Sequence, residues 1–100
     1  MTLEEYQIAA ARTINQSLSA PDRLLDAAAG LAEEAGEVLG MVRKERMQSR
    51  PMDTGRLREE LGDALWCLAV AAQSVGMTLD EVATANVEKL KARHPNGFRA

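Results

Sequence analysis

Residues 31–37 read Leu-Ala-Glu-Glu-Ala-Gly-Glu, and residues 59–63 read Glu-Glu-Leu-Gly-Asp. Both stretches lie in segments whose apolar residues recur at helical spacing. Midway between them is Gln48-Ser49-Arg50-Pro51, in which serine and proline favour a turn. We therefore expect two long helices that fold back on each other, antiparallel, about residues 48–51. The rest of the chain is organised around this hairpin.

The hairpin would bring four carboxylates to one level. Residues three apart share one face of a helix, so Glu34 points with Glu37, and Glu60 points with Asp63. Four carboxylates cannot share a small space unless a cation or protons neutralise them. An all-oxygen cluster favours a hard cation, and Mg²⁺ is the usual one where phosphates are bound. The plainer alternative is that these acids are solvated faces of amphipathic helices.

The whole chain has the size of one domain, spanning residues 1–100. Its composition is 46% hydrophobic with three aromatic residues, and mainly helix-forming residues supply the apolar content. A net charge of -3 gives no general attraction to nucleic acid or to an anionic membrane. No apolar run is long enough to span a bilayer, and the start of the chain does not resemble a signal peptide. The expected location is therefore cytoplasmic, and Cys67 is expected to be a buried structural thiol.

The pattern outward from the hairpin predicts two shorter helices and no useful strand. Capping boxes beginning at Thr2 and Thr78 mark the starts of the first and the last helix. Three glycines, Gly30, Gly36 and Gly40, fall inside the second helix, where each costs about 1 kcal/mol relative to alanine. Either a partner helix or ligand approaches them closely, or they are merely tolerated. The predicted fold is an all-α four-helix bundle around the antiparallel hairpin, with helices over about residues 3–16, 22–47, 54–75 and 79–94.

The acidic stretches resemble a known family signature. Glu33-Glu34-Ala35-Gly36-Glu37 followed by Glu60-Leu61-Gly62-Asp63 is similar to the Glu-Glu-x-x-Glu and Glu-x-x-Asp motifs of MazG-like nucleoside triphosphate pyrophosphohydrolases. These belong to the all-α NTP pyrophosphatase superfamily. Tyr6-Gln7 and the ending from Asn86 to Phe98 extend the resemblance over nearly the whole chain. It implies a reaction in which an NTP or dNTP and water give an NMP and pyrophosphate.

The resemblance also implies roles for particular residues. Glu34, Glu37, Glu60 and Asp63 match the Mg²⁺ ligands of the family, with Mn²⁺ as an expected substitute. Glu33 matches the remaining acid, which either binds a second ion or orients the attacking water. Together these five acids are the predicted catalytic set.

Some residues must offset the charge of a triphosphate beside five acids. Lys89 and Asn86 share a face of the last helix and lie near positions where the family contacts nucleotide, and both can donate to phosphate or sugar oxygens. Arg93 is a weaker candidate. Trp66 could stack on a base, or it could be a core tryptophan. Three other cations near the predicted turn are also weaker candidates: Arg50, Arg56 and Arg58. The cations at the end of the second helix fit the helix dipole, and these are Arg43, Lys44 and Arg46.

The expected function is removal of surplus or non-standard nucleotides by a homodimer or a dimer of dimers, because one small chain would leave apolar helix faces wet. Neither nucleic acid nor membrane is an expected partner. Two alternatives stay open. One is a narrow-specificity dUTP or dCTP pyrophosphatase or a phosphoribosyl-ATP pyrophosphohydrolase. The other is a non-catalytic helical interaction module. The sequence leaves base and sugar preference open.

Overall fold

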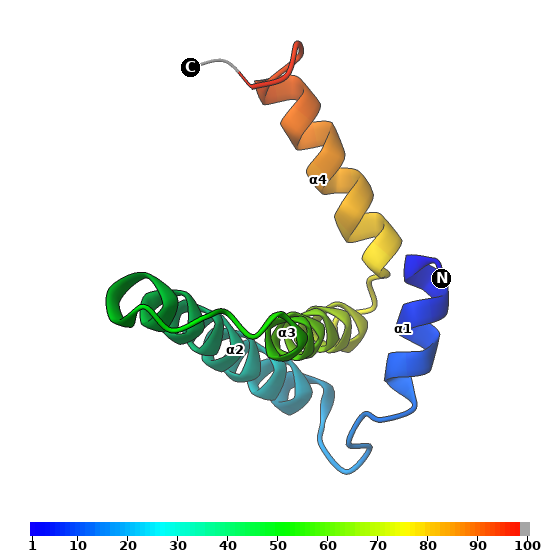
Figure 1. Cartoon of the computed structure of the whole chain (residues 1–100). Helices are drawn as coiled ribbons and strands as arrows, with labels where there is room; N and C mark the ends of the chain where they lie inside the picture. The colour runs from blue at the N-terminus through cyan, green and yellow to red at the C-terminus, as the bar shows by residue number, and fades with distance from the viewer. Residues whose placement is uncertain (99–100) are drawn as a thin grey trace.

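The computed structural model describes residues 1–98, so the last two residues of the predicted 1–100 domain lie outside the described residues. Its four helices are shown in Figure 1. They are α1 Leu3–Ala11, α2 Ala20–Gln48, α3 Thr54–Ser74 and α4 Leu79–Arg93. Between residues 1 and 98 there is no strand, and a single isolated bridge joins Pro95 to Gly97. The prediction of an all-α fold is confirmed.

The hairpin of α2 and α3 turns where the sequence predicts. Helix α2 begins after Ser19, whose side chain accepts a hydrogen bond from the backbone of Asp22, and it ends at Ser49 in the left-handed conformation, with φ 53°. Helix α3 begins after Asp53, whose Oδ1 accepts from the Arg56 backbone N–H at 3.1 Å. Five loop residues therefore separate two capped helices, and these two helices pack together more extensively than any other pair.

Helix α1 is shorter than the predicted segment to residue 16, because it ends at Ala11. Its capping box is present, since Thr2 and Glu5 bond to each other's backbone. Beyond Ala11 the side chains compete for the backbone: Thr13 Oγ1 donates to a carbonyl in α1, and Asn15 Oδ1 accepts from the backbone of Ser17. Such local bonds favour turns over helix continuation, so the predicted end was wrong by about one turn.

The core lies where α1 crosses α3. Trp66 packs against both clusters of buried residues, and its indole N–H donates to Thr13 Oγ1 at 2.7 Å. Gln7 connects α1 to the start of α4, because its side chain donates to the carbonyl of Met77 and accepts from the N–H of Leu79. Buried residues of the core are Ala10, Ile14, Ala27, Cys67, Ala69, Val70, Ala72 and Leu79.

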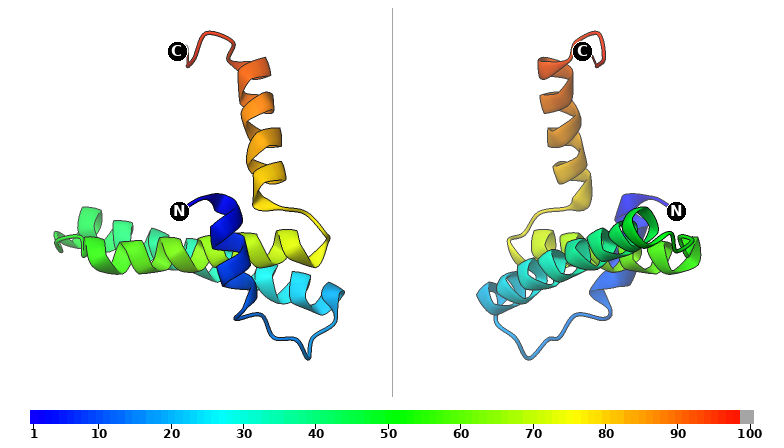
Figure 2. Two further views of the ribbon diagram at one scale, coloured as in Figure 1. Left: turned by 90° about the vertical axis from the view of Figure 1, so that its right-hand side faces the viewer. Right: turned by 60° about the vertical axis from the view of Figure 1, so that its left-hand side comes forward.

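Helix α4 leaves the hairpin and projects away from it (Figures 1 and 2). It follows Gly76, whose φ of 76° ends α3, and Thr78, whose side chain accepts from Glu81 N–H. Among the described residues it contacts α1 and α3 but not α2. The apolar side chains of Val82, Val87 and Leu90 on this helix are 42–46% exposed. A single chain therefore leaves this apolar face uncovered.

None of the helices in residues 1–98 combines the length with the apolar character that crossing a bilayer requires.

Candidate metal centre

Three glutamates meet in the groove between α2 and α3. Glu34 and Glu37 come from α2 and Glu60 from α3, and each offers a carboxylate oxygen that lies within 4.8 Å of the other two. Opposite oxygen ligands of one Mg²⁺ are about 4.2 Å apart, from its metal–oxygen distance. Small side-chain rotations would therefore let all three reach one ion. The helical hairpin brings together residues that are distant in the sequence, since Glu34 and Glu60 are 26 positions apart.

The electrostatics of the three glutamates favour a cation beside them. Glu34 Oε2 is buried and has no hydrogen-bond partner, which is costly for a carboxylate oxygen. The pKa of Glu60 is raised, first because its protonated carboxyl can hydrogen-bond to Glu34, and then by desolvation and the charges of Glu34 and Asp63. Hydrogen bonding with Glu37 acts in the opposite direction and lowers the pKa of Glu60. A proton on Glu60 thus relieves part of the repulsion that a bound cation would relieve fully.

The fourth predicted ligand, Asp63, lies outside this group of three. It is exposed, one helical turn along α3 from Glu60. It lines an adjoining pocket of about 270 Å³ together with Glu33 and Glu34. The hairpin therefore brings three of the four predicted metal ligands together and leaves Asp63 and Glu33 beside them.

Trp66 forms one wall of the same pocket. It does so while its indole N–H is held by Thr13 and its ring packs against the core. The two interpretations of this tryptophan are compatible, because one part of the side chain anchors α1 and another borders the pocket. Cys67 and Gly30 close the pocket where the helices approach each other. Burial raises the pKa of the Cys67 thiol, and the charges of Glu34 and other nearby acids raise it further.

The glycines of α2 divide into two kinds. A Cβ on Gly30 would lie 2.9 Å from Cys67 Sγ, so the predicted close approach of a partner helix is confirmed there. Gly36 and Gly40 would have nothing within 4 Å of a Cβ. No contact of the described residues requires a glycine at those two positions.

The α4 candidates are not near the glutamates of their own chain. Asn86, Lys89 and Arg93 are exposed, and α4 makes no contact with α2 among residues 1–98. Figure 2 shows α4 standing away from the hairpin in both views.

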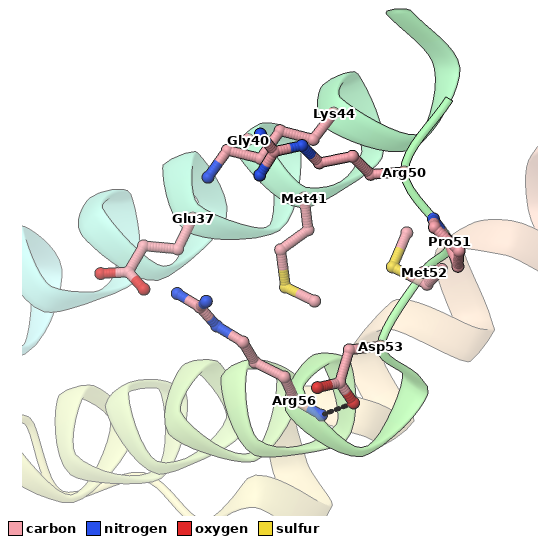
Figure 3. A pocket seen from close by; sticks show the side chains of 9 residues that line it. All are labelled: Glu37, Gly40, Met41, Lys44, Arg50, Pro51, Met52, Asp53 and Arg56. Carbon is pink, nitrogen blue, oxygen red and sulfur yellow. Dashed lines mark hydrogen bonds between the residues drawn. The ribbon is translucent and has the colours of Figure 1, made fainter. Parts of the chain in front are cut away.

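A larger pocket, which the sequence reasoning missed, borders the cluster on the side of the α2–α3 loop. Its volume is about 430 Å³, and Glu37 belongs to both features. Lys44, Arg50 and Arg56 bring three cations to its wall (Figure 3). The signal was present, because Lys44 follows Glu37 by two helical turns and therefore shares its face. The remaining residues of the lining are Gly40, Met41, Pro51, Met52 and Asp53.

Comparison with known proteins agrees with this geometry. The family model of the MazG nucleotide pyrophosphohydrolase domain matches residues 23–98, a span that contains nearly all of the hairpin, the clustered glutamates and α4. Neither the search of curated proteins nor the search of solved structures returned a match. Because the matched span covers most of the chain, this protein belongs to the MazG nucleotide pyrophosphohydrolase domain family.

Proposed function

We propose that this protein is a Mg²⁺-dependent nucleoside triphosphate pyrophosphohydrolase that converts an NTP or dNTP and water into an NMP and pyrophosphate. The observation that carries the proposal is the meeting of Glu34, Glu37 and Glu60, of which Glu34 has a buried Oε2 with no hydrogen-bond partner. Membership in the nucleotide pyrophosphohydrolase family supports the same reaction class. Packing alone gives no reason to gather three acids in one groove.

The donor set fits a hard cation, since it consists of carboxylate oxygens only. Glu34, Glu37 and Glu60 would hold the ion, with Asp63 completing the set from the next turn of α3. When bound, Mg²⁺ supplies charge stabilisation for the phosphoryl group and lowers the pKa of bound water. Mn²⁺ would serve as a substitute. Glu33 lies next to this set on α2, and we assign it the role of accepting a hydrogen bond from the attacking water.

In the proposed reaction, the water oxygen forms a bond to the α-phosphorus and the bond from that phosphorus to the bridging oxygen breaks. The electron pair of the broken bond leaves with the pyrophosphate, and the water gives its proton to the Glu33 carboxylate. The chain contributes positioning and charge rather than a covalent intermediate.

We further propose that the active form is a homodimer or a dimer of dimers, in which α4 of one copy covers the hairpin of another. Leu25 and Leu39 of α2 are 68% and 67% exposed, and α4 exposes Val87 and Leu90. Contact between copies would remove these surfaces from water. It would also bring candidate substrate ligands to the glutamates of the neighbouring copy. These ligands are Asn86, Lys89 and Arg93.

Mixing two inactive variants tests this arrangement. Glu37→Gln loses a metal ligand and Lys89→Ala loses a phosphate ligand, so each should have little activity alone. Mixed and allowed to exchange subunits, they should regain part of the wild-type activity, because some sites then combine an intact hairpin with an intact α4. No recovery after demonstrated exchange would contradict a shared site, and a monomeric mass by light scattering would contradict the oligomer.

Hydrolysis of a panel of ribo- and deoxynucleoside triphosphates, with and without Mg²⁺, tests the function. NMP and pyrophosphate formed only with the metal would support it. Activity confined to dUTP or dCTP, or to phosphoribosyl-ATP added to the panel, would select the narrow-specificity alternative at the same metal site. Formation of NDP and phosphate, or no turnover of any substrate, would contradict the proposal.

A further inference from the structure

The groove between α2 and α3 has opposite chemical character on the two sides of the clustered glutamates. Toward the loop lies the pocket of about 430 Å³, here called the basic pocket, which contains Lys44, Arg50 and Arg56. Toward the start of α2 lies the pocket of about 270 Å³, here called the acidic pocket, which contains Trp66. Glu37 belongs to the first pocket and Glu34 to the second, so the cluster stands at their junction.

The charges of the basic pocket favour an anion. Three cationic side chains face two acids, Glu37 and Asp53, in a protein whose net charge is -3. Glu37 is also one of the clustered glutamates, and one oxygen of Asp53 already caps α3 by accepting from the backbone N–H of Arg56. The cations are therefore in excess of the acids left to pair with them. Guanidinium groups and a lysine amine are the side chains best suited to bind phosphate oxygens.

The cationic side chains of this pocket are directed toward Glu37 (Figure 3). Figure 3 shows the Arg56 guanidinium pointing from α3 toward Glu37, and the side chains of Lys44 and Arg50 extending past Gly40 in the same direction. Seven residues of helix, or about 10 Å, separate Glu37 from Lys44 along α2. A phosphate chain held at the glutamates would meet these cations as it extends toward the loop.

The acidic pocket offers the opposite chemistry. Asp26 supplies hydrogen-bond acceptors, and Trp66 and Ala29 supply apolar surface. Carboxylates accept hydrogen bonds from sugar hydroxyls and from amino groups of bases, whereas they repel phosphate oxygens. A nucleoside fits this lining, and a diphosphate does not.

We propose that the substrate lies along the groove in one direction, with the departing diphosphate in the basic pocket and the nucleoside in the acidic pocket. This inference rests on the proposed function and adds to it a phosphate site that is built from Lys44, Arg50 and Arg56. The bond that breaks then lies beside Glu34, Glu37 and Glu60, at the junction of the two pockets. Pyrophosphate leaves toward the α2–α3 loop, whose residues line that end of the pocket.

Calorimetric titration with inorganic pyrophosphate and, separately, with an NMP in Mg²⁺ buffer tests the direction. The variants are Lys44→Gln and Arg50→Gln, and the matched controls are Arg43→Gln and Arg58→Gln, which remove the same charge outside the pocket. Loss of a charge-assisted hydrogen bond should weaken pyrophosphate binding by about tenfold in each pocket variant. NMP affinity should stay within about twofold, and both controls should bind like the wild type.

Ala29→Leu supplies the reciprocal change, because Ala29 is an exposed helical residue that lines the acidic pocket. It should weaken NMP binding and leave pyrophosphate binding unchanged. The inference is overturned if Lys44→Gln and Arg43→Gln have equal effects on pyrophosphate, or if the pocket variants weaken NMP as much as pyrophosphate. Turnover of an NTP by the wild type is measured on the same samples, so a wrong direction in an active enzyme is distinguished from a wrong reaction class.

Discussion

Gly30 of α2 lies against Cys67 of α3 so closely that a Cβ on the glycine would be 2.9 Å from the cysteine Sγ. This contact sets the distance between the two helices. It lies one turn from Glu34 on α2 and one turn from Asp63 on α3. The spacing that forms the acidic pocket therefore depends on a small residue at position 30.

Replacing that glycine should destabilise the fold. Gly30→Ala gains about 1 kcal/mol of helix propensity but overpacks the contact, which costs about 1–3 kcal/mol. Urea unfolding should show a net loss, and Cys67→Ala in the same chain should restore stability by removing Sγ. Gly36→Ala is the control, because its Cβ would meet nothing within 4 Å, and it should stabilise by up to about 1 kcal/mol. Equal effects of the two alanines would contradict the close contact.

The raised pKa of Glu60 predicts how pH affects the metal-free protein. The folded state holds this proton more tightly than the unfolded chain, whose pKa is near 4.5. The stabilisation from the bound proton is complete below pH 4.5 and is lost as pH rises through the folded-state pKa. Glu60→Gln should therefore gain stability relative to wild type as pH rises from 4.5 toward neutrality. Urea unfolding of both proteins across this range measures the difference, and a flat or falling difference would contradict the assignment.

The thiol of Cys67 should react slowly with alkylating reagents. Burial and neighbouring acids raise its pKa, so at pH 8 the folded protein contains less thiolate than an unfolded chain does. Iodoacetamide labelling should be much slower in buffer than in urea, and its pH profile should lie at higher pH in the folded protein. The same rate in both conditions would mean that the side chain is accessible and its pKa is ordinary.

The hydrogen bond from Trp66 to Thr13 should stabilise the attachment of α1. Thr13→Val removes the acceptor at nearly constant volume and should cost about 0.5–1.5 kcal/mol in urea unfolding. Trp66→Phe should remove the same interaction, so the double variant should cost less than the sum of the two. Thr84→Val, at an exposed position of α4, is the control and should change stability by less than about 0.5 kcal/mol. Simple additivity would show that the two side chains are not coupled.

The hairpin was predictable because its signals are local. Helical periodicity, the turn at residues 48–51 and the i, i+3 spacing of the acids all follow from backbone geometry that neighbouring residues determine. The end of α1 was not predictable, because hydrogen bonds of the Thr13 and Asn15 side chains replace the backbone bonds of a helix there. Sequence periodicity does not reveal which of the two kinds of bond is stronger.

At the candidate site, the sequence predicted which acids lie together better than it predicted which cations do. Spacing placed Glu34, Glu37 and Glu60 together, but it could not show that Asp63 lies outside the group of three. Lys44 was assigned to the helix dipole, because a cation near the C-terminal end of a helix is stabilised there even when no pocket is present. The basic pocket exists only after α2, the loop and α3 are placed in space.

Direct metal binding tests the central claim, that Glu34, Glu37 and Glu60 form a metal centre. Titration with Mn²⁺, followed by electron paramagnetic resonance, should give saturable binding to the wild type and at least tenfold weaker binding to Glu34→Gln. Glu59→Gln, which removes an exposed acid next to Glu60, is the matched control and should bind like the wild type. Binding that is equally strong in all three proteins would contradict the assignment, because the ion would then be held elsewhere.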